Sequence, residues 1–347
     1  MPTITLAIPS YNRPVETAFL LDSILAADTF PDEVLLCEDC SPERPAIREM
    51  AAGYADRFLA SGISLVYHEN ERNLGYDKNL KNLIRRASGE WVLMMGNDDR
   101  LLKPGVGPIR DFLRSRSGVR FLSCAYEQFD GTSGRPLHVQ RYFPEDTVEK
   151  CRPAYVFKLA SFISGVCAQR EWALGLETDR FDGGLFYQVY LSASAYSGAG
   201  IGYVATPVVG GRRGGKPLFG AAASEKGMHS PGRIAAKSRT AMYASVLAIA
   251  QFIDEKVKDE VSPTGESEPG PGIAEGIRRE LDSKQIFHVY EDFVGRPKSE
   301  VRDLYRHLRC LGLGKSLLHR LMFATAYFGG PAAPLLFRAA RKLRDTL

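Results

Sequence analysis

Two adjacent carboxylates, Asp98 and Asp99, follow directly after the apolar run WVLMM at residues 91–95. Neighbouring negative charges repel each other, and a hard cation or a ribose hydroxyl offsets such repulsion. Together with Asn97, the pair is therefore a candidate site for a divalent metal ion and the diphosphate of a nucleotide. The alternative is that the two residues only end a strand and cap the following helix, because Asp favours such positions.

A second group of polar residues follows the first apolar run of the chain, in the sequence PSYNRP at residues 9–14. A nucleotide base could stack on the ring of Tyr11, and a helix that begins at Pro14 offers free N–H groups to an anion. The alternative is an ordinary polar turn before a helix that starts with proline. The nucleotide-binding candidates here are Pro9, Tyr11, Asn12 and Arg13.

Three further candidates lie after the second and third apolar runs. Glu38 and Asp39 could accept hydrogen bonds from a base N–H or from ribose hydroxyls, although an acidic turn is the plain alternative. Lys78 falls near the start of a predicted helix, where a cation opposes the helix dipole. A bound diphosphate would relieve this conflict, but an exposed surface lysine would need no such partner.

A basic, glycine-rich segment, GGRRGGKPLFG, spans residues 210–220. Its flexibility and charge suit a flap that closes over phosphates, with Arg212, Arg213 and Lys216 stabilising a departing nucleoside diphosphate. A merely solvated loop is the alternative.

Short apolar runs alternate with longer amphipathic segments over the first 124 residues, a pattern typical of a parallel sheet flanked by helices. Ligands bind at the carboxyl ends of such strands, so the polar clusters at residues 10–13, 38–41 and 97–100 are expected to form one site. We predict strands near residues 3–9, 33–37, 63–68, 90–96 and 119–124, and helices near 14–27, 45–59, 76–87 and 104–115. A helix at 185–197 and a strand at 202–205 follow.

The predicted domain organisation is a catalytic domain at residues 1–230, with a nucleotide-binding half (1–124) and an acceptor half (125–230). A helix at 231–258, a flexible linker at 259–276 and a separate basic helical region at 277–347 follow. Residues 298–347 contain ten Lys or Arg against three Asp or Glu. A basic tail favours an anionic membrane surface over nucleic acid.

The apolar run LMFATAYFGGPAAPLLF, at residues 321–337, is interrupted by Pro331 and Pro334. It predicts in-plane membrane attachment, with packing against the catalytic domain or a true span as alternatives. The start of the chain shows no signal-peptide pattern, so we expect a cytoplasmic protein, peripheral at the inner membrane. Cys37 and Cys40 have the C-x-x-C spacing but no second pair nearby, which indicates two buried residues rather than a zinc site.

The order of the motifs PSYNR, ED before Ser41, NLGYDKN and GNDD resembles the family 2 glycosyltransferases of the GT-A fold, over about residues 1–210. Within that family the chain is similar to the bacterial O-antigen and polysaccharide branch, including abequosyltransferase-like enzymes. The resemblance implies a Rossmann-like, mostly parallel sheet flanked by helices. It also implies a donor linked to UDP, GDP, CDP or dTDP.

The resemblance assigns roles to residues of this chain. It implies that Pro9, Tyr11, Glu38 or Asp39, and Lys78 contact the nucleoside, that Asp98 contacts the ribose side, and that Asp99 coordinates Mg²⁺ or Mn²⁺. The family pattern has a further Asp at the position of Gly96, so coordination would rest on Asp99, water and phosphate oxygens.

The family's catalytic Glu-Asp pair is absent from the corresponding stretch DGGLFYQ at residues 182–188. Asp182 is the nearest candidate for the base, with Asp179 behind it, and either could instead be a helix cap. The expected reaction is metal-assisted sugar transfer to a hydroxyl of a lipid-linked or oligosaccharide acceptor in cell-surface polysaccharide synthesis. The alternatives are a non-catalytic scaffold of the same fold and a nucleotidyltransferase.

Overall fold

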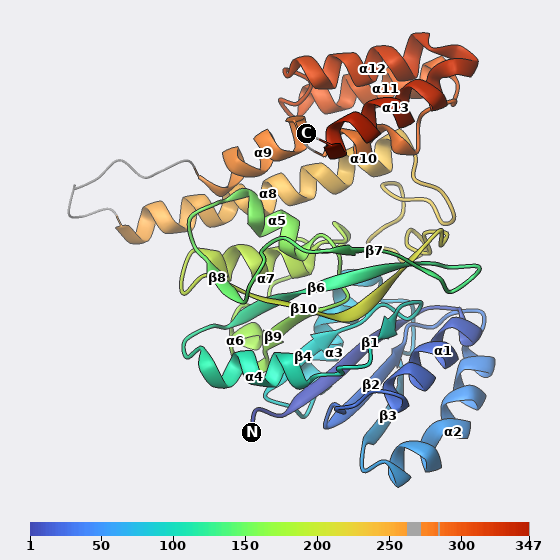
Figure 1. Ribbon diagram of the computed structural model, residues 1–347, viewed down its shortest axis with the longest axis vertical. Helices are drawn as coiled ribbons and strands as arrows, with labels where there is room; N and C mark the ends of the chain where they lie inside the picture. Colours follow the sequence, from blue (N-terminus) through green and yellow to red (C-terminus); the bar gives the residue numbers. More distant parts are fainter. Residues whose placement is uncertain (262–271, 284, 347) are drawn as a thin grey trace.

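The computed structural model describes residues 1–261, 272–283 and 285–346. Its strands belong to one sheet (Figure 1). They are β1 (Ile4–Ser10), β2 (Glu33–Glu38), β3 (Ser64–Glu69), β4 (Trp91–Met94), β5 (Arg100–Leu101), β6 (Phe121–Asp130), β7 (Pro136–Gln140), β8 (Thr147–Glu149), β9 (Val166–Gln169) and β10 (Ile201–Arg213).

The first seven helices alternate with these strands, and the remainder follow them. The α-helices are α1 (Pro14–Leu25), α2 (Arg44–Ala60), α3 (Tyr76–Arg86), α4 (Gly107–Ser115), α5 (Ala154–Ala160), α6 (Arg170–Gly175), α7 (Tyr187–Tyr196), α8 (Ala236–Val261), α9 (Ile273–Ser283), α10 (Ile286–Glu291), α11 (Lys298–Cys310), α12 (Leu317–Phe328) and α13 (Ala333–Thr346), with a 3₁₀ turn, η1 (Gly330–Ala332), before α13.

The strand order is β3-β2-β1-β4-β9-β6-β10-β5, with β7 beside β6 and β8 beside β10. Strands β1 to β4 are parallel to one another. Strand β9 is antiparallel to both β4 and β6, while β6 and β10 are parallel. Strands β1, β2, β3, β4, β6 and β10 therefore point the same way, with the short β9 antiparallel between β4 and β6, which confirms the mostly parallel sheet flanked by helices.

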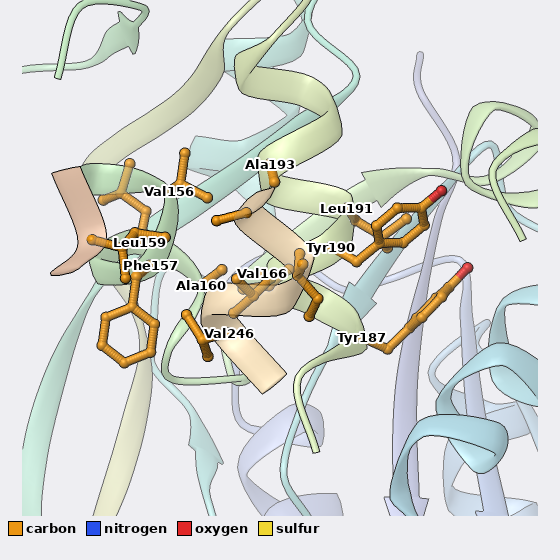
Figure 2. Packing of buried hydrophobic residues seen from close by; sticks show 14 of the residues in the cluster. Val156, Phe157, Leu159, Ala160, Val166, Tyr187, Tyr190, Leu191, Ala193 and Val246 are labelled. Carbon is orange, nitrogen blue, oxygen red and sulfur yellow. The ribbon is translucent and has the colours of Figure 1, made fainter. Parts of the chain in front are cut away.

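Side chains alternate between two apolar cores, one on each face of the sheet. In β1, Ile4, Leu6 and Ile8 face the core covered by α1, α2 and α4, whereas Ala7 faces the opposite core. A strand with both faces buried needs a nearly continuous apolar run. The segment TLAIP at residues 5–9 provides one, as expected for a central strand. Figure 2 shows the core that Ala7 faces, called the second core below, where Val246 of α8 packs among side chains of α5 and α7.

The C-terminal helices continue this second core. Helix α8 packs against α7, α9 and α11, and α12 contacts α9, α10 and α11. The same apolar cluster runs from Ala7 of β1 to Phe337 of α13, so the prediction of a separate C-terminal unit is wrong. The helices stack at the end of the molecule away from the N-terminus (Figure 1).

Three sequence expectations differ from the observed elements. Helix α9 begins at Ile273, inside the segment 259–276 predicted as a linker, and residues 262–271 of that segment lie outside the described residues. Strand β10 extends to Arg213 rather than ending near residue 205. The apolar run at 321–337 forms parts of α12 and α13, and among the described helices none is long and apolar enough to cross a bilayer.

One buried histidine connects α12 to α9 and α10. Asp282, at the end of α9, accepts hydrogen bonds from the Ser316 N–H (2.7 Å) and from Nδ1 of His319 (2.8 Å). The Nε2 atom of His319 lies 3.2 Å from the Tyr290 hydroxyl. Because His319 is fully buried, these contacts hold α12 in register on α9 and α10.

Candidate functional site

A pocket of about 260 Å³ lies at the carboxyl ends of β1, β2 and β4. This is the edge at which an α/β sheet binds ligands. Residues 217–219, from the segment after β10, form part of its wall. Six of the predicted nucleotide-site residues line it together: Pro9, Tyr11, Arg13, Asp39, Asn97 and Asp98.

The turn after β1 has an unusual backbone that positions Arg13. Asn12 and Arg13 both have left-handed φ angles, 57° and 66°. Such angles are costly for residues with a Cβ and are kept where the surroundings hold them. Here the Glu43 carboxylate accepts from the Arg13 N–H (2.9 Å), and the Asn97 amide donates to the Asn12 carbonyl (3.1 Å). Asn12 thus supports the pocket without lining it.

The Arg13 side chain joins the acidic pair to the segment after β10. Its Nη1 atom lies 2.8 Å from Oδ2 of Asp98, and its Nη2 atom donates to the Lys216 carbonyl (2.6 Å). The guanidinium therefore neutralises part of the charge of Asp98 and holds residue 216 over the pocket. The Lys216 side chain itself is exposed.

Asp99 lies behind Asp98 and is 6% exposed. Its Oδ1 atom accepts from the Arg212 N–H (2.8 Å), and its Oδ2 atom accepts from the Ser164 hydroxyl. Burial, with a smaller contribution from the neighbouring charge of Asp98, raises the pKa of Asp99 to about 7. Ser164 is absent from the sequence prediction, because its type and neighbours carry no signal of a contact 65 residues away.

The acidic pair is chemically suited to a divalent cation. A Cβ placed on Gly96 would lie 2.9 Å from Oδ2 of Asp99 and 3.6 Å from Oδ1 of Asp98, so both carboxylates border the same small space. Mg²⁺ and Mn²⁺ favour such oxygen ligands. The described residues contain no group of three His, Cys, Asp or Glu side chains that could hold a metal ion. Further ligands would have to come from a diphosphate and water.

Asp39 is buried at the inner wall of the pocket. It accepts hydrogen bonds from the Asn70 amide (2.8 Å) and from the N–H groups of Leu74 (2.8 Å) and Gly75 (2.9 Å). Burial raises its pKa to about 6, although these hydrogen bonds act in the opposite direction. The carboxylate thereby holds the turn that leads into α3.

The structure does not bring Glu38 into the pocket. Glu38 is fully buried and accepts from the N–H groups of Cys40 (2.9 Å) and Ser41 (2.8 Å) and from Nε of Arg44 (2.9 Å). Its role here is to fix the loop between β2 and α2. Cys37 is buried as expected, but Cys40 is partly exposed, and both are free thiols.

Asp77, on the first turn of α3, is a site residue that the sequence analysis did not select. It is 2% exposed and accepts from three backbone N–H groups, those of Gly183 (2.9 Å), Leu185 (2.9 Å) and Tyr187 (3.0 Å). It therefore shapes the turn at residues 182–187, which carries the candidate base. An Asp at the start of a predicted helix, within the motif NLGYDKN, was the available signal.

Asp182 is held by lysines of α3. Its Oδ1 atom accepts from Nζ of Lys81 (2.7 Å), which is 2% exposed and also contacts Asp179. Its Oδ2 atom has no hydrogen-bond partner in the structure and lies 3.6 Å from Nζ of Lys78. Lys78 thus faces Asp182 rather than the nucleotide pocket. Asp179 is largely exposed, which leaves Asp182 as the enclosed carboxylate.

The three basic residues predicted for a diphosphate are not gathered at one point. Arg212 and Arg213 end β10 rather than lying in a loop. The Arg212 guanidinium pairs with Glu16 (3.1 Å) and donates to the Gly131 carbonyl (3.0 Å). Arg212 therefore contacts the acidic pair through its backbone N–H group, which donates to Asp99. Arg213 borders a second, larger cavity.

Glu225 connects the segment after β10 to α3. Its buried carboxylate accepts from the Tyr76 N–H (2.7 Å) and the Gly220 N–H (2.5 Å), and it also lines the pocket. His229, unassigned from sequence, is buried with Nε2 3.1 Å from the Gly183 carbonyl. Both residues fix residues 217–229 across the open side of the pocket.

An α/β sheet with a pocket and an acidic pair at its strand ends has the arrangement in which such sheets bind ligands, here with a candidate cation site. Residues 5–167 match the profile of the family described as glycosyl transferase family 2. This region, somewhat under half of the chain, is therefore similar to the glycosyl transferases of family 2.

Curated relatives resemble the same region. Abequosyltransferase RfbV of Salmonella typhimurium is 26% identical over 116 residues, 33% of this chain and 34% of that protein. An uncharacterized glycosyltransferase of Haemophilus influenzae is 23% identical over 119 residues, 34% of this chain and 37% of that protein. The matches thus span about a third of the length of these relatives.

Solved structures share the fold over nearly the whole chain. A crystal structure of S. aureus TarS 1–349 in complex with UDP has a TM-score of 0.55 at 16% identity, covering 99% of this chain and 92% of that one. The mannosyltransferase PcManGT from Pyrobaculum calidifontis, in complex with GDP-Man and Mn²⁺, has a TM-score of 0.51 at 15% identity, covering 99% and 84%. The GT-A fold expected from the sequence is confirmed.

Proposed function

We propose that the protein transfers a sugar from a nucleotide-sugar donor to a hydroxyl of a lipid-linked or oligosaccharide acceptor in cell-surface polysaccharide synthesis. The observation that carries this proposal is the pocket at the strand ends, where six predicted nucleotide-site residues converge beside the acidic pair. The match of residues 5–167 to the profile of family 2 supports the reaction class. Proteins of the same fold bind UDP and GDP-Man, which supports a nucleoside diphosphate in this pocket.

In this proposal the base stacks on Tyr11 and the ribose side faces Asp39, Asn97 and Asp98. Arg13 sits where the pocket meets the acidic pair and could turn from Asp98 toward a phosphate. A divalent Mg²⁺ or Mn²⁺ held through Asp99 and Asp98 would offset the charge that builds on the departing diphosphate. Bound Mn²⁺ in the GT-A fold of PcManGT supports this cofactor.

Asp182 is our candidate for the base that removes the proton from the acceptor hydroxyl. Its Oδ1 atom is occupied by Lys81, whereas Oδ2 has no hydrogen-bond partner and so keeps a lone pair for that proton. Lys78, on the other side of Oδ2, orients the carboxylate. The three N–H groups bound by Asp77 hold the turn on which Asp182 lies.

We further propose that the protein acts at the cytoplasmic face of a membrane through its last two helices. Exposed large apolar side chains are concentrated there, with Leu317 74% and Phe328 71% exposed, alongside Leu321, Leu335 and Leu336. The basic excess of residues 298–347 lies on the same part of the chain. An apolar surface bordered by cations binds the interface of an anionic bilayer without spanning it.

The donor site is tested by thermal unfolding with Mn²⁺ and a panel of nucleoside diphosphates. One nucleotide is expected to raise the Tm by a few degrees, since ligand at 100 times its Kd adds about 2.7 kcal/mol of stability. Asp99→Asn should lose this metal-dependent shift relative to its own ligand-free Tm. Asp111→Asn, an exposed change on α4, is the matched control and should keep it. No shift with any nucleotide would sink the assignment.

Hydrolysis of the donor in the absence of acceptor separates an enzyme from a scaffold of the same fold. We expect slow release of the nucleoside diphosphate from one nucleotide sugar, because water can take the place of the acceptor hydroxyl. Asp182→Asn should reduce this release, while the nucleotide-induced Tm shift persists. Nucleotide binding with no turnover in either the presence or the absence of acceptor would favour the scaffold.

A further inference from the structure

Residues 217–232, which follow β10, form a compact loop that is called the covering loop below. Its two ends are joined by a hydrogen bond from the Gly232 N–H to the Pro217 carbonyl (2.8 Å). Surface loops whose ends meet in this way pack as units, and many of them are functional. The loop walls the proposed donor pocket with the side chains of Pro217, Leu218, Phe219, Ala221 and Glu225. Its position therefore shapes that pocket.

His229 lies inside the covering loop and is 4% exposed. Its Nε2 atom lies 3.1 Å from the Gly183 carbonyl, and its Nδ1 atom lies 2.8 Å from the hydroxyl of Ser238, at the start of α8. A carbonyl oxygen only accepts, so Nε2 carries the proton and donates to Gly183, while Nδ1 accepts from Ser238. Burial lowers the pKa of His229, which keeps the ring in this neutral form at neutral pH.

A second ring of the loop joins this histidine to the donor pocket. The Phe219 ring lines the pocket and meets the His229 ring edge to face, with the centroids 5.4 Å apart and the planes at 81°. This is a favourable geometry for a pair of aromatic rings. A nucleotide that packs against Phe219 would therefore press on the ring that holds Gly183.

The covering loop also packs directly on the backbone of the turn at residues 182–187. Gly183 has a φ of 85°, and a Cβ placed on it would lie 2.2 Å from the Ser224 carbonyl oxygen. Glycine alone allows both this conformation and this close approach. The glycine beside Asp182 thus has a packing role, since it lets the turn that carries the candidate base lie against the loop that walls the donor pocket.

Helix α3 anchors both the loop and the turn. The Glu225 carboxylate of the loop accepts from the Tyr76 N–H (2.7 Å), and the Asp77 carboxylate accepts from the Gly183 N–H (2.9 Å). Because Tyr76 and Asp77 are neighbours, the loop and the turn meet at one end of α3. The hydrogen bond from His229 to Gly183 then joins the two to each other.

We propose that His229 is a positioning residue for sugar transfer, which fixes the turn at residues 182–187, and with it Asp182, to the covering loop. This role rests on the proposed function and connects its donor pocket with its candidate base. The loop and the turn open together in the free protein. A nucleotide that closes the loop also orders the turn, so Asp182 is held in place once the donor is bound. His229 does not line the pocket and acts through Gly183 and Phe219.

Hydrogen–deuterium exchange of the full chain, read by mass spectrometry, measures the opening of the loop and of the turn separately. UDP, GDP, CDP and dTDP are added in turn, each with Mn²⁺. In the parent, one of them should slow exchange about tenfold or more, both at residues 217–232 and at the N–H groups of residues 183–187. His229→Phe keeps a ring beside Phe219 but cannot donate. In this variant the same nucleotide should slow the loop as before and the turn by less than about threefold.

His229→Gln carries a side-chain N–H that can reach the Gly183 carbonyl and should restore the slowing at the turn. A general loss of stability would produce no such rescue. His307→Phe, an exposed change on α11, is the matched control and should behave as the parent. Ser238→Ala keeps the ring and removes only the hydroxyl that selects its tautomer. It should lose about threefold of the slowing at the turn, and it tests the same contact if His229→Phe does not fold.

Equal slowing of loop and turn in His229→Phe and in Ser238→Ala, or slowing of the loop alone in the parent, would overturn the positioning role while leaving the donor site intact. Failure of His229→Gln to restore the slowing would overturn it as well. If none of the four nucleotides slowed exchange in the parent, the donor site itself would be refuted, and the positioning role with it.

Discussion

Replacing Asp77 by alanine tests whether one buried carboxylate organises the turn that carries Asp182. In the structure this carboxylate accepts from three backbone N–H groups at 2.9–3.0 Å. Alanine leaves all three buried donors without an acceptor. Each unsatisfied donor costs about 1–3 kcal/mol, but the turn can relax and admit water, so we expect a total loss of about 3 kcal/mol. Asp77→Asn keeps one carbonyl oxygen and should lose about half as much.

Urea unfolding followed by circular dichroism measures this loss as a lower midpoint at an unchanged slope. Donor hydrolysis should fall in parallel, because the turn that holds the candidate base is loosened. Asp56→Ala, an exposed change on α2, is the control and should alter the free energy of unfolding by less than about 0.5 kcal/mol. If Asp77→Ala were as stable as the parent, the hydrogen bonds would not hold the turn and this reasoning would be refuted.

Three further outcomes are expected. Lys81→Met should destabilise the protein by about 3 kcal/mol or more, because it leaves Asp182, whose side chain is only 10% exposed, without its closest cation. Lys78→Met, at a side chain 44% exposed, should cost far less, and equal losses in urea unfolding would contradict this. Burial lowers the pKa of His319, so the unfolded chain takes up this proton first as the pH falls through the ordinary value of 6.5, and the histidine should then lower the Tm. The buried Asp39 and Asp99, whose pKa values are raised, act in the opposite direction over the same range, so the effect of His319 is measured as the difference between parent and variant. His319→Asn should raise the Tm relative to the parent progressively below pH 6.5, and a constant difference would show that the histidine is not responsible. Sedimentation with vesicles rich in phosphatidylglycerol should recover the parent but little of a Leu335→Asp, Leu336→Asp double variant, while equal recovery would rule out this surface as the membrane contact.

The elements of the N-terminal half could be predicted closely from the sequence, because each strand there is a short apolar run followed by polar residues. The edges of β1, β2 and α3 agree with the predicted ranges to within one or two residues. The convergence of Tyr11, Asp39 and Asp98 on one pocket followed from the rule that parallel strands present their carboxyl ends at one edge. Their binding roles stay predictions.

The remaining contacts could not be predicted, because they join distant residues without a periodic pattern. Ser164 reaches Asp99, and Glu225 reaches the start of α3, and neither has a local signal. The antiparallel β9 is four residues long and resembles any short apolar run. Lys78 was predicted to face a phosphate because it lies near a helix start, but Asp182 supplies the negative partner that offsets its conflict with the helix dipole.

The position of β9 has a consequence for how the chain is synthesised. Strands β4 and β6 leave the ribosome before β9, which covers one edge of β4 and the 121–123 stretch of one edge of β6. Until residues 166–169 insert, the nascent protein exposes these unpaired stretches, which are templates for association with other chains. Polar substitutions at Val166 or Ala168 should therefore reduce soluble yield in cells and produce inclusion bodies, even though neither residue lines the proposed donor pocket.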